Sequence, residues 1–162
     1  MSVESNCLSD DKGIYTLLIK ICALIQVKVG RLGELKFSGL CGYTGSAMGK
    51  GSTNLRNRIS RHLRSEQKKI RWHIDYLLDR PDVEVKRVVT SATLEKRKEC
   101  EVAMLLNESA EVLHRIDWFG SSDCSCSSHL AYLGTNLNRA VRTIIEAHLK
   151  AGLKPLDRSK YP

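Results

Sequence analysis

The chain has 162 residues, of which 42% are apolar and 27% charged, and a formal net charge of +8. This length suits one domain with a real core and makes a second independent domain unexpected. The polar, acidic start over 1–12 lacks the basic region of a secretory signal, and the apolar run 14–25 is too short to span a bilayer, so we expect a cytoplasmic protein without membrane contact.

Strand patterns dominate the first part of the chain. Segments 13–21 and 39–46 carry apolar and β-branched residues bounded by glycines, which is typical of strands in one sheet. Between them, 27–37 predicts a further strand pair around a glycine turn. Residues 83–89 alternate well enough to predict another strand, and 112–116 predict one more.

Helical spacing appears first after the loop 48–53. Leu55, Ile59 and Leu63 recur at the period of a helix, with Asn54 or Thr53 as its N-cap. Their positions predict one buried stripe with arginines on its flanks.

Three further helices are expected. A short one over 72–78 ends before Pro81, and Thr93 is expected to cap another over 94–106. An amphipathic helix over 136–150 should stop at Gly152. The whole predicts an α+β domain over 13–152, with a small, mainly antiparallel central sheet flanked by helices, a flexible start over 1–12 and a tail over 153–162.

The positive charge is concentrated in one window. Residues 50–71 contain eight basic residues against one acid, Glu66, which accounts for +7 of the net +8. Such a run is often only a solvated helix face. Beside Tyr15, Tyr43, Arg58 and His62, which could hold a phosphodiester, phosphate binding is the better interpretation. The residues expected to contact DNA are Lys50, Arg56, Arg61, Arg64, Lys68, Lys69 and Arg71.

Two short motifs and two helical residues suggest phosphodiester chemistry. They are Gly13-Ile14-Tyr15, Tyr43-Thr44-Gly45, Arg58 and His62. Arg58 and His62 are four residues apart, so on a helix they point the same way and could contact one phosphate. The Arg58 guanidinium can stabilise the charge that grows at phosphorus in the transition state.

The order of these residues resembles the GIY-YIG nuclease superfamily, although the second motif reads Tyr-Thr-Gly. The resemblance implies a metal-dependent DNA endonuclease using Mg²⁺ or Mn²⁺, and it implies neighbouring antiparallel strands for the two tyrosines. It makes Tyr15 the general base candidate and Tyr43 its supporting partner. A free phenol has a pKa of about 10, so nearby cations or a metal-bound water would have to lower it. The alternative is a pair of tyrosines packed on the core.

The superfamily takes one metal-binding glutamate from a later helix. Here the expected helix over 94–106 offers Glu95, Glu99 and Glu101. Glu99 borders the apolar residues of this helix and can turn inward, whereas Glu101 points more to solvent. We therefore choose Glu99 as the metal ligand, with Glu101 as the alternative.

A second imidazole follows the basic window in Trp72-His73-Ile74-Asp75-Tyr76. His73 could contact substrate or help position water, as a histidine in this interval does in homing enzymes of the superfamily. A capping or core histidine is the alternative. Asp75 could orient His73 or pair with an arginine.

The segment 119–130 holds Cys124, Cys126 and His129 among serines and glycines. It resembles a hallmark of a largely archaeal branch of GIY-YIG proteins, some of which are joined to base-excision DNA glycosylases. The spacing C-x-C-x2-H offers only three zinc ligands, so a polar loop packed beside the active site is the favoured interpretation over zinc binding. The remaining cysteines are interpreted as free and incidental, namely Cys7, Cys22, Cys41 and Cys100.

These observations predict an endonuclease acting in DNA repair. Its expected partners are structured or damaged duplex DNA and a repair protein. A basic nucleic-acid-binding module with the same fold but no catalysis is the rival from another class. A zinc-dependent interaction protein built on Cys124, Cys126 and His129 is the third hypothesis.

Overall fold

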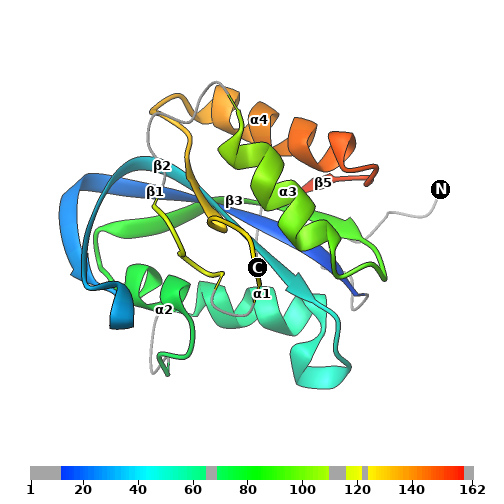
Figure 1. Ribbon diagram of the computed structural model, residues 1–162, viewed down its shortest axis with the longest axis horizontal. Helices are drawn as coiled ribbons and strands as arrows, with labels where there is room; N and C mark the ends of the chain where they lie inside the picture. The colour runs from blue at the N-terminus through cyan, green and yellow to red at the C-terminus, as the bar shows by residue number, and fades with distance from the viewer. Residues whose placement is uncertain (1–11, 65–68, 110–115, 122–123, 159–162) are drawn as a thin grey trace.

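The computed structural model describes residues 12–64, 69–109, 116–121 and 124–158, apart from the side chain of Ser52. A long antiparallel hairpin runs through it, formed by β1 (Gly13–Lys28) and β2 (Glu34–Ala47) (Figure 1). The short 3-10 helix η1 (Gly30–Leu32) makes the turn, as the glycines there predicted. The expected pair of separate strands within 27–37 is wrong, because β1 and β2 continue through it. The pairing of β1 with β2 shifts register between Ile21 and Ile25, so the two strands continue past this irregularity.

Three more strands complete the sheet. β3 (Val83–Ala92) pairs with β1, β4 (Leu130–Tyr132) with β2, and β5 (Leu156–Arg158) with β3, all antiparallel. The order is β4-β2-β1-β3-β5. β5 lies in the segment expected to be a tail. The strand expected over 112–116 falls outside the described residues except for Ile116, which is in no strand.

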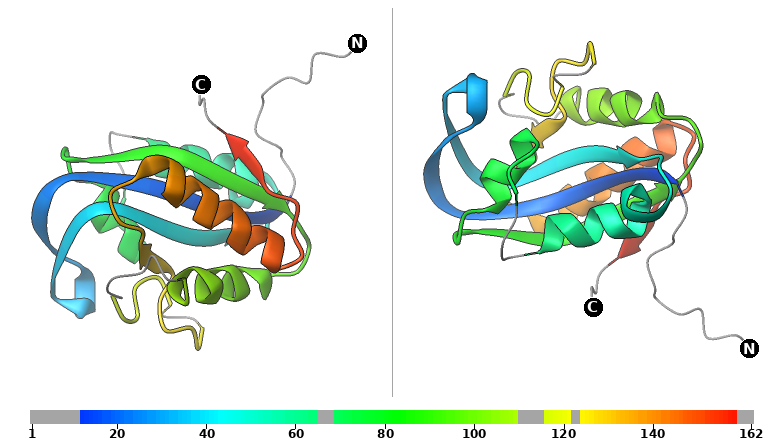
Figure 2. Two further views of the ribbon diagram at one scale, coloured as in Figure 1. Left: turned by 90° about the horizontal axis from the view of Figure 1, so that it is seen from above. Right: turned by 90° about the horizontal axis from the view of Figure 1, so that it is seen from below.

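Two helices cover one face of the sheet (Figure 2). The 3-10 helix η2 (Gly51–Thr53) leads into α1 (Leu55–Leu63), and α2 (His73–Leu78) follows. The predicted cap is confirmed, since the Asn54 side chain accepts a hydrogen bond from the Asn57 amide at 2.9 Å. Leu55 and Ile59 are buried against the sheet, as their spacing predicted.

The other two helices cover the opposite face. α4 (Leu137–Lys150) is capped by Asn136 and ends before Gly152, whose φ of 79° suits glycine. α3 (Lys98–Asn107) begins four residues later than expected. Thr93 does accept an amide hydrogen bond, but from Glu95 within a turn, so the polar segment before Lys98 is not helical.

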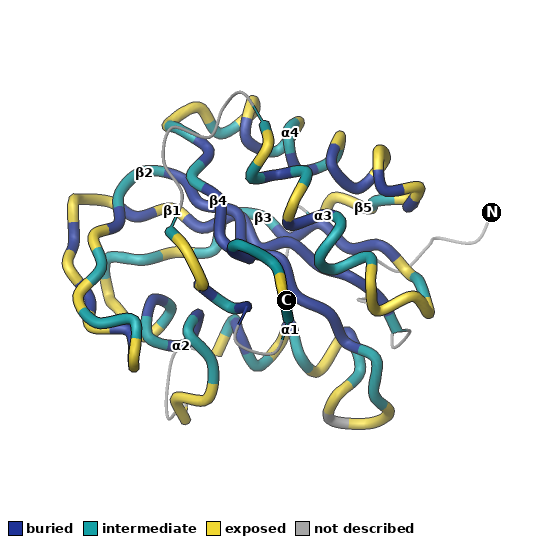
Figure 3. The backbone as a smooth tube through the Cα atoms, in the orientation of Figure 1, coloured by how far each residue is buried: buried dark blue, intermediate teal, exposed yellow. Residues whose placement is uncertain are grey.

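The strand alternation separates two cores. Tyr15, Leu17 and Ile19 belong to the cluster beneath α1 and α2, whereas Ile14 and Leu18 belong to the cluster beneath α3 and α4. The centre of the sheet is buried from both sides (Figure 3). Within the described residues the protein is therefore an α+β fold, a five-stranded antiparallel sheet packed against four helices, as predicted. None of the described helices has the length and apolar character needed to cross a membrane.

Candidate active site

Strand β1 and helix α1 bring Tyr15 and His62 into contact beneath the sheet. Tyr15 Oη lies 2.7 Å from His62 Nε2, and each residue is only 2% exposed. Gly45 on β2 is the register partner of Tyr15, and a side chain there would collide with the phenol oxygen and ring. The glycine of the second motif therefore makes room for the tyrosine of the first.

Aromatic rings surround this pair. The Tyr43 and Trp72 rings have their centroids 6.2 and 6.0 Å from that of His62. Tyr43 also packs edge to face against Phe119, at 6.2 Å. β1 and β2 are antiparallel neighbours, so both tyrosine motifs and the imidazole lie in one cluster.

Arg58 lies at the solvent side of this cluster. It is half-buried on α1, and its Cζ is 4.8 Å from the centre of the Trp72 ring. Because His62 follows one turn later on the same helix, both side chains lie against Trp72. The indole thus holds the guanidinium beside the buried histidine through a cation–π contact.

Arg61 also lies over the Trp72 ring, with its Cζ 4.4 Å from the ring centre, but unlike Arg58 it has an acidic partner. Its guanidinium forms two hydrogen bonds with the Asp75 carboxylate, at 2.9 and 3.0 Å, and a third with the Lys69 carbonyl at 2.7 Å. Asp75 is completely buried and accepts two backbone amides from the start of α2. The expected pairing of Asp75 with an arginine is confirmed, and it gives Arg61 a structural partner.

Burial sets the protonation of Tyr15. Loss of hydration raises the pKa of Tyr15 well above its usual value of 10, and Tyr43 and Glu99 raise it further, whereas Arg58 lowers it. Without a bound metal, the lowering of this pKa that a general base would require does not occur, because the ring lies inside the core. Tyr15 keeps its proton at neutral pH.

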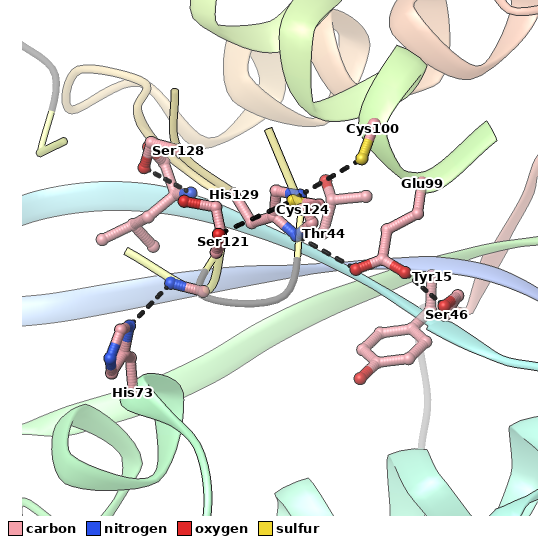
Figure 4. A network of polar contacts seen from close by, with 12 residues as sticks. Tyr15, Thr44, Ser46, His73, Glu99, Cys100, Ser121, Cys124, Ser128 and His129 are labelled. Atoms are coloured by element: carbon pink, nitrogen blue, oxygen red, sulfur yellow. Dashed lines mark hydrogen bonds and ion pairs between the residues drawn. The ribbon is translucent and has the colours of Figure 1, made fainter. Parts of the chain in front are cut away.

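Glu99 reaches the site from the other side of the sheet, at the end of β2 (Figure 4). The Ser46 hydroxyl donates a hydrogen bond to Glu99 Oε2, and Glu99 Oε1 lies 3.0 Å from His129 Nδ1. Burial opposes charge on His129, but the Glu99 carboxylate raises the pKa of the imidazole above its usual value. A hollow of about 230 Å³ opens beside Glu99, lined also by Lys96 and Arg97.

The neighbouring carboxylate lies elsewhere. Glu101 is 3.1 Å from Lys98 Nζ, and its side chain is 36% exposed against 17% for Glu99. Of the preferred glutamate and its alternative, Glu99 contacts Ser46 and His129, whereas Glu101 pairs with Lys98.

His73 anchors a loop. Its Nδ1 accepts a hydrogen bond from the Gly120 amide at 2.9 Å, and its ring packs against Phe119. Burial lowers the pKa of His73. In Figure 4 the imidazole is directed at this loop and away from Glu99, which favours a structural role, as in the alternative of a capping or core histidine, over contact with substrate.

The polar loop also carries a cysteine-rich cluster. Cys124, Cys126 and His129 of the loop meet Cys100 of α3, and the four potential ligand atoms lie within 4.8 Å of one another. Cys100, interpreted from the sequence as incidental, is thus the fourth member of this cluster. The signal in the sequence was weak, because Cys100 is 24 residues before Cys124 and only the packing of α3 on the loop joins them.

The basic window is mostly exposed around α1. The exposed members are Lys50, Arg56, Arg64, Lys69 and Arg71, whereas Arg61 is partly buried and Lys68 lies outside the described residues. Lys50 also lines a hollow of about 600 Å³ at the start of α1, together with Lys12 and Asn54. Sequence reasoning missed Ser46 and the contact of Glu99 with His129, which no local pattern marks.

Comparison with known proteins gives a family but no activity. Residues 14–150 match the family model of the domain of unknown function DUF123. No curated protein and no solved structure matches the chain. The matched region includes Tyr15, Tyr43, Glu99 and the cysteine-rich cluster. Because the match covers most of the chain, the chain belongs to the DUF123 family.

Proposed function

We propose that this chain is a GIY-YIG-type, metal-dependent endonuclease that hydrolyses phosphodiester bonds in DNA. The observation that carries the proposal is the buried Tyr15–His62 hydrogen bond with Arg58 and Tyr43 beside it. A phenol, an imidazole and a guanidinium assembled from β1 and α1 are more than a core needs. The order of these residues along the chain is that of the superfamily.

Arg58 is proposed to bind the scissile phosphate. Its guanidinium is half-buried and stacked on Trp72, so it is already oriented before substrate arrives. A preorganised planar donor can bind two phosphate oxygens and stabilise the additional negative charge of the transition state.

Tyr15 is proposed to pass a proton to His62. With its pKa raised by burial, the phenol is a poor base by itself. Its hydroxyl can donate to His62 Nε2 while its oxygen accepts a proton from the attacking water. In this arrangement His62 takes the proton at the end, and Tyr43 supports its ring.

Glu99 fits a hard divalent cation such as Mg²⁺ or Mn²⁺. Its two oxygens contact Ser46 and His129, and a carboxylate oxygen keeps a further lone pair beside one such contact. The contacts themselves hold the carboxylate at the end of β2. A bound cation there would supply charge stabilisation at the phosphate and acidify a water molecule.

The exposed basic residues around α1 support DNA as the substrate. Phosphate contacts of this kind bind DNA without reading its sequence. We therefore propose a structured or damaged duplex as the target and DNA repair as the role. A repair protein is proposed as a partner, because contacts to the DNA backbone alone do not select a sequence.

The test compares two glutamates of one helix. Parent, Glu99→Gln and Glu101→Gln proteins are incubated with nicked, abasic, branched and intact DNA, with Mg²⁺, Mn²⁺ or chelator. Glu99→Gln should lose cleavage roughly 100-fold or more while still binding DNA, because the amide lacks the anionic oxygen. Glu101→Gln should cleave like the parent.

Either of two results would contradict the proposed endonuclease activity. The first is a parent protein that cuts none of these DNA forms with either metal, and the second is Glu99→Gln cutting as fast as the parent. A parent that binds DNA without cutting it would leave a basic binding module with this fold.

A further inference from the structure

We propose that Cys100, Cys124, Cys126 and His129 bind one structural Zn²⁺, and that His129 as a zinc ligand holds Glu99 through its other ring nitrogen. The zinc site is independent of the endonuclease. The consequence for Glu99 as a catalytic metal ligand rests on the proposed function.

The donor atoms have the spacing of a zinc site. His129 Nε2 lies 3.4 Å from Cys124 Sγ and 3.8 Å from Cys100 Sγ. In a tetrahedral site with ordinary Zn–S and Zn–N bonds, these edges are roughly 3.6 Å. All four donors lie within 4.8 Å of one another, so small side-chain movements would close the tetrahedron.

The kind of donor selects the ion. Three thiolates and one imidazole form a soft set that favours zinc over Mg²⁺, Mn²⁺ or Ca²⁺. Four protein ligands also leave no open position for water or substrate, which is typical of structural zinc. This ion is therefore distinct from the hard cation proposed at Glu99.

The two ring nitrogens of His129 face different groups. Nε2 faces the thiols, and Nδ1 lies 3.0 Å from Glu99 Oε1. Zinc-bound histidines commonly donate their second N–H to a carboxylate, which fixes the tautomer and the ring. With zinc on Nε2, Nδ1 would carry the proton, and a small turn of either side chain would let it donate to Glu99 and hold the carboxylate beside Ser46.

The backbone around His129 fixes its position. Its amide donates to the Phe119 carbonyl at 2.8 Å, and its carbonyl accepts the Thr44 amide of β2 at 3.0 Å. Cys100 comes from α3 on the other side of the cluster. Zinc would thus join α3 to the loop before β4, and would hold the loop against the end of the tyrosine-bearing hairpin.

Zinc content tests the site directly. The full chain is purified without chelator, and its metal is measured by inductively coupled plasma mass spectrometry. The parent and Cys22→Ala, whose thiol is exposed and outside the cluster, should each retain about one zinc per chain. Cys100→Ala should retain roughly tenfold less against a chelator, because it leaves only three ligands.

A spectroscopic measurement covers the case in which Cys100→Ala fails to fold. The parent, loaded with Co²⁺ in place of zinc, should show a thiolate-to-metal charge-transfer band and the visible bands of a tetrahedral site. A parent that takes up neither metal overturns the proposal, as does a disulfide between two of the three thiols in freshly purified protein. The proposal is also overturned if Cys100→Ala retains as much zinc as the parent.

The link to Glu99 has its own readout, which needs no DNA. Glu99→Gln should weaken zinc retention roughly tenfold through loss of the carboxylate partner, and Glu101→Gln should not. Unchanged zinc affinity in Glu99→Gln would overturn the link. Metal retention and DNA cleavage are separate measurements. An inactive protein that holds zinc would contradict only the proposed endonuclease activity. An active protein that holds no zinc would contradict only the proposed zinc site.

Discussion

The two faces of the sheet bury His62 of α1 and His148 of α4, and these two imidazoles have different surroundings. His148 of α4 has both ring nitrogens occupied by hydroxyls, with Thr16 Oγ1 at 2.9 Å and Ser91 Oγ at 2.8 Å. His62 of α1 binds a phenol and lies against the indole on which Arg58 stacks. Tyr15 and Thr16 are consecutive residues, so the alternation of β1 sends each to a different histidine.

This comparison separates a polar core from a candidate site. The Thr16–His148–Ser91 group is closed, because each ring nitrogen has a neutral partner and apolar residues surround it. The Tyr15–His62 group adjoins a charged residue that is only half-buried. Both histidines are buried and hydrogen-bonded, so the half-buried charge of Arg58 nearby is what sets His62 apart from His148.

The largest effect on stability is expected within the α1 face itself. Arg61→Ala should lower the free energy of unfolding by about 3 to 4 kcal/mol, because it leaves the buried Asp75 carboxylate without its partner. Arg58→Ala should cost less than about 1 kcal/mol and instead abolish cleavage. Urea unfolding of both variants measures this difference. Equal stability losses in the two variants would contradict a structural role for Arg61 and a catalytic role for Arg58.

On the α4 face, His148 should make the stability of the protein depend on pH. Burial lowers the pKa of His148 from 6.5 to about 4. Between these values the unfolded chain binds more protons than the folded one, so stability is full above about pH 6.5 and falls as the pH drops toward 4. The free energy of unfolding falls by about 3 kcal/mol over this range.

His148→Gln is the matched variant for this prediction. It should be less stable than the parent at pH 7, but its thermal midpoint should fall less between pH 6.5 and 4. If parent and variant lose stability in parallel across this window, His148 is not the group that titrates.

The smallest effect concerns the exposed charges of the α1 face. Arg64→Ala and Lys69→Ala should each weaken binding to every DNA sequence slightly and reduce the salt slope of log affinity by about 1. Arg142→Ala on α4 is the control for the opposite face and should change neither quantity. Fluorescence anisotropy over a range of salt concentrations measures the slopes, and equal slopes for all three variants would show the window to be merely solvated.

Local patterns predicted the parts of the molecule that local physics decides. The Leu55, Ile59 and Leu63 stripe with the Asn54 cap gave α1 its correct start, since capping and periodicity act within one turn. The pairing of the two tyrosine motifs followed from the resemblance and is seen in the register of β1 with β2. The edge strands β4 and β5 were missed because three residues carry too little pattern.

The candidate site was harder to predict where it depends on distant packing. Glu99 could be singled out from its place on the helix, but its partners Ser46 and His129 come from other elements. Likewise, Cys100 becomes a fourth potential ligand only because α3 packs on the loop. The resemblance made Tyr15 a general base candidate, and only the folded core reveals that burial raises its pKa.

The most direct test substitutes the two consecutive residues of β1, Tyr15→Phe and Thr16→Val, and measures DNA cleavage at saturating enzyme together with unfolding. Both variants remove one hydroxyl from a buried histidine, so each should lose about 1 to 3 kcal/mol of stability. Tyr15→Phe should cleave roughly 100-fold more slowly with DNA binding retained, and Thr16→Val should cleave within a few-fold of the parent. Equal cleavage by the two variants, or a greater loss in Thr16→Val, would contradict the assignment of catalysis to the α1 face.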